Sequence, residues 1–219
     1  MRPAIDLGQN PWILLLLMFL ELLFVIVPAI IASRLEDTTF TQQLQEMGFR
    51  RRHDSLLKNV GKVGAGVLIG FGFYFIGGYI SFFFRNILVE TLLGTEFIRE
   101  ASEGAINTRP YEPSLLQIVL LIFFQVALVG ICEEAFFRGF LINKLNRVMS
   151  LTSTILLSSL IFAFYHVPPF LVPLSTILTF FGYYFTFGIL LALVFLVFDF
   201  DLVPCIVAHS LFNILLLVA

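Results

Sequence analysis

Residues 115–140 read "LLQIVLLIFFQVALVGICEEAFFRGF". The part before Glu133 contains no charged side chain and has about the length that a helix needs to cross a bilayer. Two adjacent carboxylates, Glu133 and Glu134, and then Arg138 follow in surroundings that are still apolar. Because an ionisable side chain inside a membrane is costly, it is a candidate for function. The stretch therefore predicts a membrane-spanning helix that carries part of a functional site.

The whole chain shares this apolar character. Of its 219 residues, 59% are hydrophobic and 13% are charged, whereas soluble domains average about 45–50% apolar and about 25% charged residues. This composition predicts an all-α, polytopic membrane protein. The formal net charge of −2 gives no reason to expect a nucleic-acid partner. Cys132 and Cys205 lack metal-ligand spacing and are interpreted as small core residues.

Six apolar stretches are long enough, or nearly long enough, to cross a bilayer as helices. The first is followed by no clear cleavage site, so we interpret it as a retained helix and not as a signal peptide. The second is rich in glycine, which favours close helix packing. We therefore expect a transmembrane helical bundle of about six spans. The stretches are Trp12–Ser33, Val60–Phe84, Leu115 to about Phe140, Leu151–His166, Leu174–Phe198 and Leu202–Ala219.

These spans divide a single integrated membrane domain into two parts. Residues 1–114 form an N-terminal two-span region, and residues 115–219 form a four-helix core with the candidate site. The loop over residues 34–59 contains the triplet Arg50–Arg52, and its middle section is expected to form an interfacial helix. Because loops rich in lysine and arginine stay in the cytoplasm, we place this loop there and the acidic loop over residues 85–114 outside.

Side chains suited to hydrolysis recur at comparable depths in three of the stretches. Glu133 precedes the turn near Val148 by about 15 residues and His166 follows it by about 18, which places both roughly 22–27 Å along their helices. His209 lies on the last stretch, and a tilt of that helix would bring it to a similar depth. We therefore expect Glu133, His166 and His209 to meet in one cavity.

Further polar side chains lie near these three along the chain. His209 and Asn213 are four residues apart, so they share one face of a helix. Glu134 and Arg138 have the same spacing, which favours an ion pair that would neutralise a buried arginine. Glu21 lies in the middle of the first stretch, and the sequence does not name its partner. A structural partner for Glu21 is favoured over contact with a substrate.

These residue types are suited to hydrolysis of a carbonyl compound in two ways. A buried glutamate can take a proton from water, while imidazole and amide groups hold the water and the developing oxyanion. Alternatively, Glu133, His166 and His209 are a plausible zinc-binding set with an open position for water. The residues alone leave both routes open.

Three motifs, in order along the chain, carry a resemblance to a known family. Each lies on an apolar segment, and together they span about residues 115–219. In this pattern the chain resembles the CAAX-protease and bacteriocin-processing family (CPBP, also called Abi), intramembrane endopeptidases related to the type II CAAX prenyl protease. The motifs are Glu133-Glu134-x-x-x-Arg138, Phe162-x-x-x-His166 and His209-x-x-x-Asn213.

The resemblance implies a glutamate-dependent endopeptidase that requires no cofactor, with zinc or another divalent metal as the alternative. Glu133 would activate the hydrolytic water, and His166 would help to hold it. His209 and Asn213 would form the oxyanion-binding side. The adjacent pair of Glu134 and Arg138 would support the site.

The implied substrate is a peptide or protein at the lipid bilayer, with a prenylated protein as one candidate. In the prenyl proteases the cavity opens to the cytoplasm, and we expect the same side here. Those enzymes usually have more spans than the six expected in this chain, which puts the prenylated substrate in doubt but not the chemistry. A non-proteolytic membrane scaffold or immunity factor with the same fold is the alternative. A transporter is a weaker one, because no inverted repeat is visible.

Overall fold

The computed structural model of the protein describes residues 5–49 and 54–218. These residues are largely helical. The two described ranges contain no β-strand, only an isolated bridge between Asp6 and Asn107. The expected all-α fold is therefore confirmed. The arginine triplet at residues 50–52 lies outside the described residues.

Four continuous helices in the described ranges are long and apolar enough to cross a membrane, which indicates a multi-pass integral membrane protein. They are Pro11–Leu35, Leu56–Leu93, Leu115–Leu145 and Leu174–Val197. Two further apolar helices, α10 (Leu151–His166) and α12 (Leu202–Val218), have 16 and 17 residues. A straight crossing needs about 20 residues, so a total of six spans stays a prediction.

Local changes of helical geometry divide three of the long helices into segments. The first consists of α1 (Pro11–Met18), the 3₁₀ segment η1 (Phe19–Leu22) and α2 (Leu23–Leu35). The second consists of α4 (Leu56–Phe82), the π-helical segment η2 (Phe83–Glu90) and α5 (Thr91–Leu93). The third consists of α7 (Leu115–Phe124), the π-helical η3 (Gln125–Gly130), α8 (Ile131–Glu134), the π-helical η4 (Ala135–Ile142) and α9 (Asn143–Leu145). The remaining helices are α3 (Phe40–Glu46), α6 (Thr95–Glu103) and α11 (Leu174–Val197).

Several helices begin where the sequence supplies a capping side chain. Asn10 accepts a hydrogen bond from the backbone N–H of Trp12 at the start of α1, and Ser114 and Ser150 cap α7 and α10 in the same manner. Thr39 caps α3, which is the short helix expected between the first two long ones. These side chains satisfy backbone N–H groups that have no partner inside the helix.

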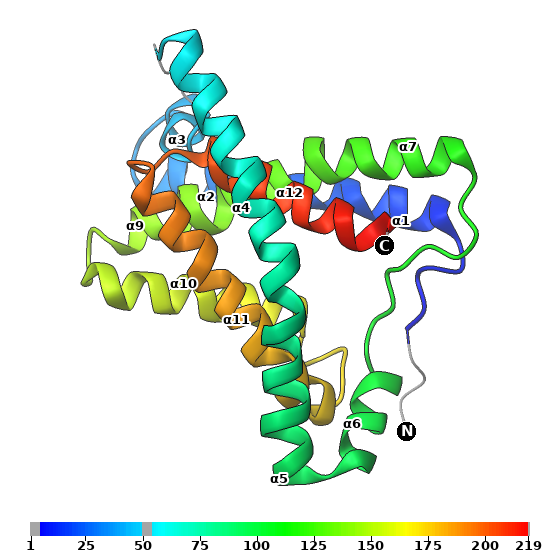
Figure 1. Cartoon of the computed structure of the whole chain (residues 1–219). Helices are drawn as coiled ribbons and strands as arrows, with labels where there is room; N and C mark the ends of the chain where they lie inside the picture. The colour runs from blue at the N-terminus through cyan, green and yellow to red at the C-terminus, as the bar shows by residue number, and fades with distance from the viewer. Residues whose placement is uncertain (1–4, 50–53, 219) are drawn as a thin grey trace.

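The segment over residues 85–114, expected as a loop, is mostly helical. The second long helix continues to Leu93, and α6 follows it directly. On α6, Arg99 and Glu103 are four residues apart and pair at 2.8 Å, a spacing that stabilises a helix. Residues 104–114 are irregular and run beside the N-terminal residues (Figure 1).

Two groups of helices diverge from a common centre (Figure 1). Helices α1, α7 and α12 extend together to one side, and the later part of α4 extends downward with α6 and the start of α11. Helices α4 and α12 approach closely because two glycines of α4 face α12. A Cβ atom added to Gly66 would lie 2.7 Å from Val207, and one added to Gly70 would lie 2.9 Å from the carbonyl oxygen of Ala208. The close packing predicted from the glycine-rich sequence is therefore present.

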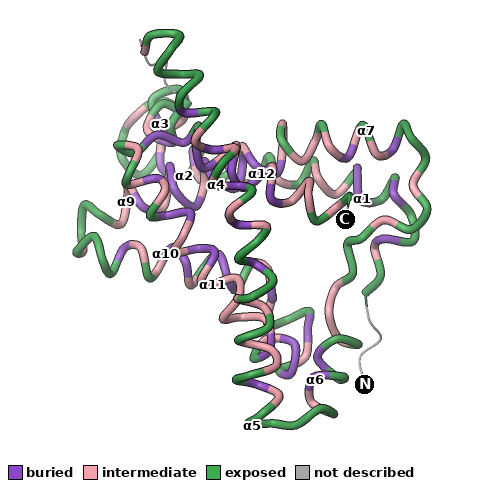
Figure 2. Tube along the Cα trace, in the orientation of Figure 1, coloured by how far each residue is buried: buried purple, intermediate pink, exposed green. Residues whose placement is uncertain are grey.

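The core lies where the helices meet (Figure 2). Met47, Phe137 and Cys205 are fully enclosed there, and Cys132 is buried as well. Both cysteines are thus core residues, as expected. The outer sides of α4 and α7 are largely exposed (Figure 2) and bear apolar side chains, which a bilayer would cover.

Candidate active site

Glu133 and Glu134 occupy a short α-helical turn, α8, between the π-helical segments η3 and η4. π-Helical turns within α-helices are frequent at functional sites. Glu133 is 3% exposed and Glu134 is fully buried. Because a buried charge needs partners, the two carboxylates depend on side chains that other parts of the fold bring to them.

Glu134 joins two side chains that donate hydrogen bonds to it. Its Oε1 atom accepts one from Nη1 of Arg138 at 2.9 Å and one from Nδ1 of His209 at 2.7 Å. The guanidinium of Arg138 also donates to the carbonyl oxygen of Gly188 at 3.1 Å and lies 4.7 Å from the ring centre of Phe162. The ion pair expected from the four-residue spacing is therefore present, and it links η4 to α10, α11 and α12.

His209 lies close to both glutamates. Its Nδ1 contacts Glu134, while its Nε2 is 3.9 Å from Oε2 of Glu133, which is beyond hydrogen-bond distance. Oε2 of Glu133 is buried and has no hydrogen-bond partner among the described residues. A carboxylate oxygen left without a partner is costly to bury, so this atom of Glu133 is not explained by the ion pair of its neighbour Glu134.

His166 ends α10 in a fixed orientation. Its Nδ1 lies 3.0 Å from the carbonyl oxygen of Phe162. Because a carbonyl oxygen can only accept, we assign the hydrogen to Nδ1, and Nε2 of the neutral ring is then an acceptor. The ring packs against Tyr184 with 4.5 Å between the ring centres. His166 can thus accept a hydrogen bond from a water molecule or a substrate.

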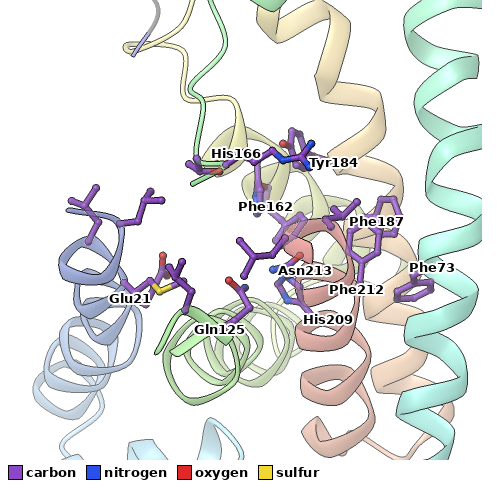
Figure 3. Close-up of a pocket in the computed structure, with 18 of the residues that line it drawn as sticks. Glu21, Phe73, Gln125, Phe162, His166, Tyr184, Phe187, His209, Phe212 and Asn213 are labelled. Carbon is purple, nitrogen blue, oxygen red and sulfur yellow. The ribbon is translucent and has the colours of Figure 1, made fainter. Parts of the chain in front are cut away.

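A cavity of 480 Å³ lies beside this network (Figure 3). His166, His209 and Asn213 line it, so the structure brings three of the predicted site residues to one space. Glu133 and Glu134 are not among the lining residues, and they adjoin the cavity through their neighbour His209. The rest of the lining is largely apolar and includes Leu14, Leu121, Phe187, Phe212 and Leu216.

Glu21 lines the same cavity from η1 (Figure 3). Its Oε1 atom accepts a hydrogen bond from the hydroxyl group of Tyr165 at 2.7 Å, and its Oε2 atom is buried without a partner among the described residues. The sequence did not identify a partner for Glu21, and in the structure this partner is Tyr165. Gln125 and Arg109 also line the cavity, and no sequence motif pointed to either.

A family model matches part of the chain. Residues 115–215 match the family described as Type II CAAX prenyl endopeptidase Rce1-like. These residues form an Rce1-like domain. The match agrees with the family that the three motifs resemble, and the Rce1-like domain suggests a peptidase. No curated protein and no solved structure matches the chain.

The side chains of the Rce1-like domain are not arranged as a zinc site. Within residues 5–49 and 54–218, no group of three or more His, Cys, Asp or Glu side chains is placed to hold a metal ion. His209 uses Nδ1 to bind Glu134, and His166 uses Nδ1 to bind a backbone carbonyl. We therefore derive no step through a metal.

The cavity beside the Rce1-like domain's polar network reaches the surface at one end of the molecule. Leu7, Thr108 and Arg109 line it there, near the first turns of α1 and α7. Lys144 and Arg147, expected to be cytoplasmic, lie in and just after the last turn at the opposite end of the long helix that begins with α7. A cytoplasmic basic end and a cavity open to the cytoplasm were both expected from the sequence, and the side on which the cavity opens stays a prediction.

Proposed function

We propose that the protein is an intramembrane endopeptidase, which hydrolyses a peptide bond near the membrane with a water molecule activated by Glu133. The proposal is supported by two observations: His166 on α10 and His209 on α12 line one cavity, and Oε2 of Glu133 on α8 lies 3.9 Å from Nε2 of His209. An ion pair that only joined helices would account for Glu134 and Arg138. It would not account for a buried, partnerless carboxylate oxygen on Glu133 next to a histidine.

The proposed mechanism requires a hydrogen on both ring nitrogens of His209. Glu133 and Glu134 contribute two negative charges, and Arg138 contributes one positive charge. An imidazolium at His209, with Nδ1 donating to Glu134, supplies the second positive charge, and buried charges are tolerated when they are paired in this way. In this state Nε2 of His209 also carries a hydrogen, which it can donate to an oxyanion.

Hydrolysis then proceeds in two steps. Glu133 removes a proton from a water molecule that donates its other hydrogen to Nε2 of His166, and the hydroxide adds to the carbonyl carbon. The resulting oxyanion accepts hydrogen bonds from Nε2 of His209 and from the amide of Asn213. As the C–N bond breaks, Glu133 returns its proton to the leaving amine. The products are a new C-terminal carboxyl group and a new N-terminal amine.

The test is the substitution Glu133→Gln, which keeps the size of the side chain and removes the base. Cleavage is expected to fall by about 10²–10⁴-fold. Membrane fractions from cells with the wild type and with the variant are compared by proteomics for new C-termini. Glu96→Gln on α6 is the matched control, because Glu96 is exposed and does not line the cavity. Wild-type turnover by the purified Glu133→Gln protein would end the assignment.

Metal analysis distinguishes a zinc-dependent hydrolysis from the glutamate-dependent hydrolysis proposed here. Protein that cleaves its substrate in strong chelator, with no bound metal, does not require zinc. Loss of cleavage in chelator that added zinc restores would favour a metal, and the side chains of the site would then have to rearrange to bind it.

The phenotype of cells that carry site variants distinguishes a non-proteolytic scaffold or immunity factor from an endopeptidase. Alanine variants of Glu133, His166 and His209 would each keep full biological function in that case. Loss of function in all three, with normal amounts of protein in the membrane, supports the endopeptidase.

A further inference from the structure

Positive charge gathers at one end of the molecule. Arg34 lies in the last turn of α2, and Lys144 and Arg147 lie in and after α9. Lys144 pairs with Glu36 at 2.6 Å and with Glu46 at 2.8 Å, so the segment before α3 and the end of α3 meet α9 here. We call this region the basic end.

Helix α4 begins at the same end and adds further positive charge. Lys58 pairs with Asp54 at 2.9 Å, and Lys62 pairs with both Asp54 and Asp201, which precedes α12. The sequence places three more arginines in the connection before α4, at residues 50–52, outside the described residues. Three connections therefore lie at the basic end: the one from α2 to α4, the one from α9 to α10 and the one from α11 to α12.

The opposite end of the molecule has an excess of acidic side chains. Helix α4 and its continuation lead away from the basic end, and α6 and residues 104–114 follow (Figure 1). The lysine and arginine side chains of residues 85–114 are Arg85, Arg99 and Arg109, against Glu90, Glu96, Glu100, Glu103 and Glu112. Because positively charged connections stay in the cytoplasm and acidic residues contribute little to orientation, the basic end is the cytoplasmic one.

The candidate active site is closed toward the basic end. Phe137 and Ile142 lie between Glu134 and Lys144 on the same helix, and both are fully enclosed. Met47 is also fully enclosed, and its backbone packs so tightly on η4 that a Cβ atom at Gly139 would lie 2.0 Å from the Met47 carbonyl oxygen. The cavity beside the site is lined by no residue of the basic end, where a separate hollow lies among Glu46, Gly139 and Arg147.

The cavity instead reaches the opposite end, which contains residues 85–114 and which we call the acidic end. Leu7, Thr108 and Arg109 line its outer part, and Thr108 and Arg109 are exposed. Leu216 and Leu217, near the C-terminal end of α12, also line it, whereas α12 begins at the basic end beside Asp201. The cavity therefore extends from His209 along α12 in the direction away from the basic end.

We infer that the cavity opens on the side of the membrane away from the cytoplasm. Taken with the proposed function, on which this step rests, the substrates are peptides or segments of membrane proteins presented from the non-cytoplasmic side. The apolar lining of the cavity suits an extended, largely hydrophobic peptide. A prenylated C-terminus in the cytoplasm would face the closed end of the protein. The expectation of access from the cytoplasm is replaced by this proposal.

The test is the labelling of single introduced cysteines with a membrane-impermeant maleimide. Thr108→Cys marks the mouth of the cavity, and Asn146→Cys marks the basic end, where Asn146 is exposed. Cys132 and Cys205 are buried, so the unmodified protein is the background control. The thiol at position 108 is expected to react in intact cells, and the thiol at position 146 only after the membrane is permeabilised.

The reverse pattern, or equal labelling of both positions in intact cells, would overturn the inference. Tyr111→Cys and Val148→Cys, at residues 71% and 79% exposed, repeat the comparison if either first variant fails to accumulate. Labelling does not depend on cleavage. An inactive protein with the expected labelling would therefore count against the endopeptidase alone, and an active protein with the reverse labelling would count against the access route alone.

Discussion

Arg138 is a charged side chain that is only 1% exposed, and its partner Glu134 is fully buried. The pair does more than neutralise charge, because Oε1 of Glu134 also holds Nδ1 of His209. The orientation of His209 therefore depends on a contact that Arg138 stabilises. Neither Arg138 nor Glu134 lines the cavity, so we propose that both residues position His209.

The substitution Arg138→Leu tests how much the buried pair stabilises the fold. It leaves Glu134 buried without its arginine, and the free energy of unfolding is expected to fall by about 3–5 kcal/mol. Arg99→Leu on α6 is the matched control, because Arg99 is 55% exposed, and surface pairs contribute about 0–1 kcal/mol. Unfolding in detergent, followed by circular dichroism, measures both. Equal losses in the two variants would contradict a specific role for the buried pair.

Glu21 and Tyr165 offer a second test at this scale. Tyr165→Phe removes the donor and leaves Oε1 of Glu21 without its hydrogen bond, which is expected to cost about 0.5–1.5 kcal/mol because this bond is exposed. Adding Glu21→Leu removes the stranded carboxylate, so the double variant is expected to be more stable than Tyr165→Phe alone. Thermal unfolding of the wild type and of the single and double variants checks this order. A double variant less stable than Tyr165→Phe would show that Glu21 has another partner.

The sequence could identify the site residues because charged and imidazole groups are rare in such an apolar chain. It also predicted the Glu134–Arg138 pair, since both partners lie on one helix. It could not pair Glu21 with Tyr165, because that contact joins residues 144 positions apart and depends on how two helices rotate against each other. The contact between Glu134 and His209 was missed for the same reason.

At the scale of helices, the two faces of α4 differ in what they can accommodate. Gly66 faces α12, where a Cβ atom would lie 2.7 Å from Val207 and 2.9 Å from the carbonyl oxygen of Pro204. Gly64 lies two residues earlier on another face, where an added Cβ atom would meet none of the described atoms within 4 Å. The same substitution should therefore have opposite effects at the two positions.

Gly66→Ala is expected to lower the free energy of unfolding by about 1–3 kcal/mol, because it forces α4 and α12 apart. Gly64→Ala is expected to be neutral or to raise it by up to about 1 kcal/mol, because alanine favours a helix over glycine. Unfolding in detergent measures both variants. A stable Gly66→Ala protein would mean that the contact between α4 and α12 is looser than the structure describes.

Hydropathy located the apolar helices well, because the run of apolar residues is itself the signal. It ended the second helix too early, since Arg85 and Glu90 interrupt the apolar pattern while the helix continues to Leu93. The π-helical segments beside Glu133 have no signature in hydropathy, and they alter which way the following side chains point. The divergence of the two groups of helices (Figure 1) likewise depends on packing, which single-helix patterns do not encode.

At the scale of the whole molecule, ion pairs hold the connections together at the basic end. The hydrogen bonds from Lys144 keep the pKa of Glu36 and of Glu46 below its usual value. The hydrogen bond from Lys62 is the main reason that the pKa of Asp54 is lowered to about 2. These three carboxylates lie before α3, at the end of α3 and just before α4, so protonating them is expected to loosen one end of the fold.

The sign of the pH dependence follows from these shifts. Each carboxylate has a lower pKa in the folded protein than in the unfolded chain, so its stabilisation is complete above the unfolded values, about 4 to 4.3. It is lost as the pH falls through the folded values, which for Asp54 extends to about 2.

The unfolding temperature in detergent is therefore expected to drop between pH 5 and pH 3 (about one unit either side of the unfolded values). The drop should be smaller for the variant Glu46→Gln, which has already lost one of these groups. High salt should also reduce it, because the pairs are partly exposed and salt screens them. An identical drop in the variant and the wild type would place the acid-sensitive groups elsewhere in the protein.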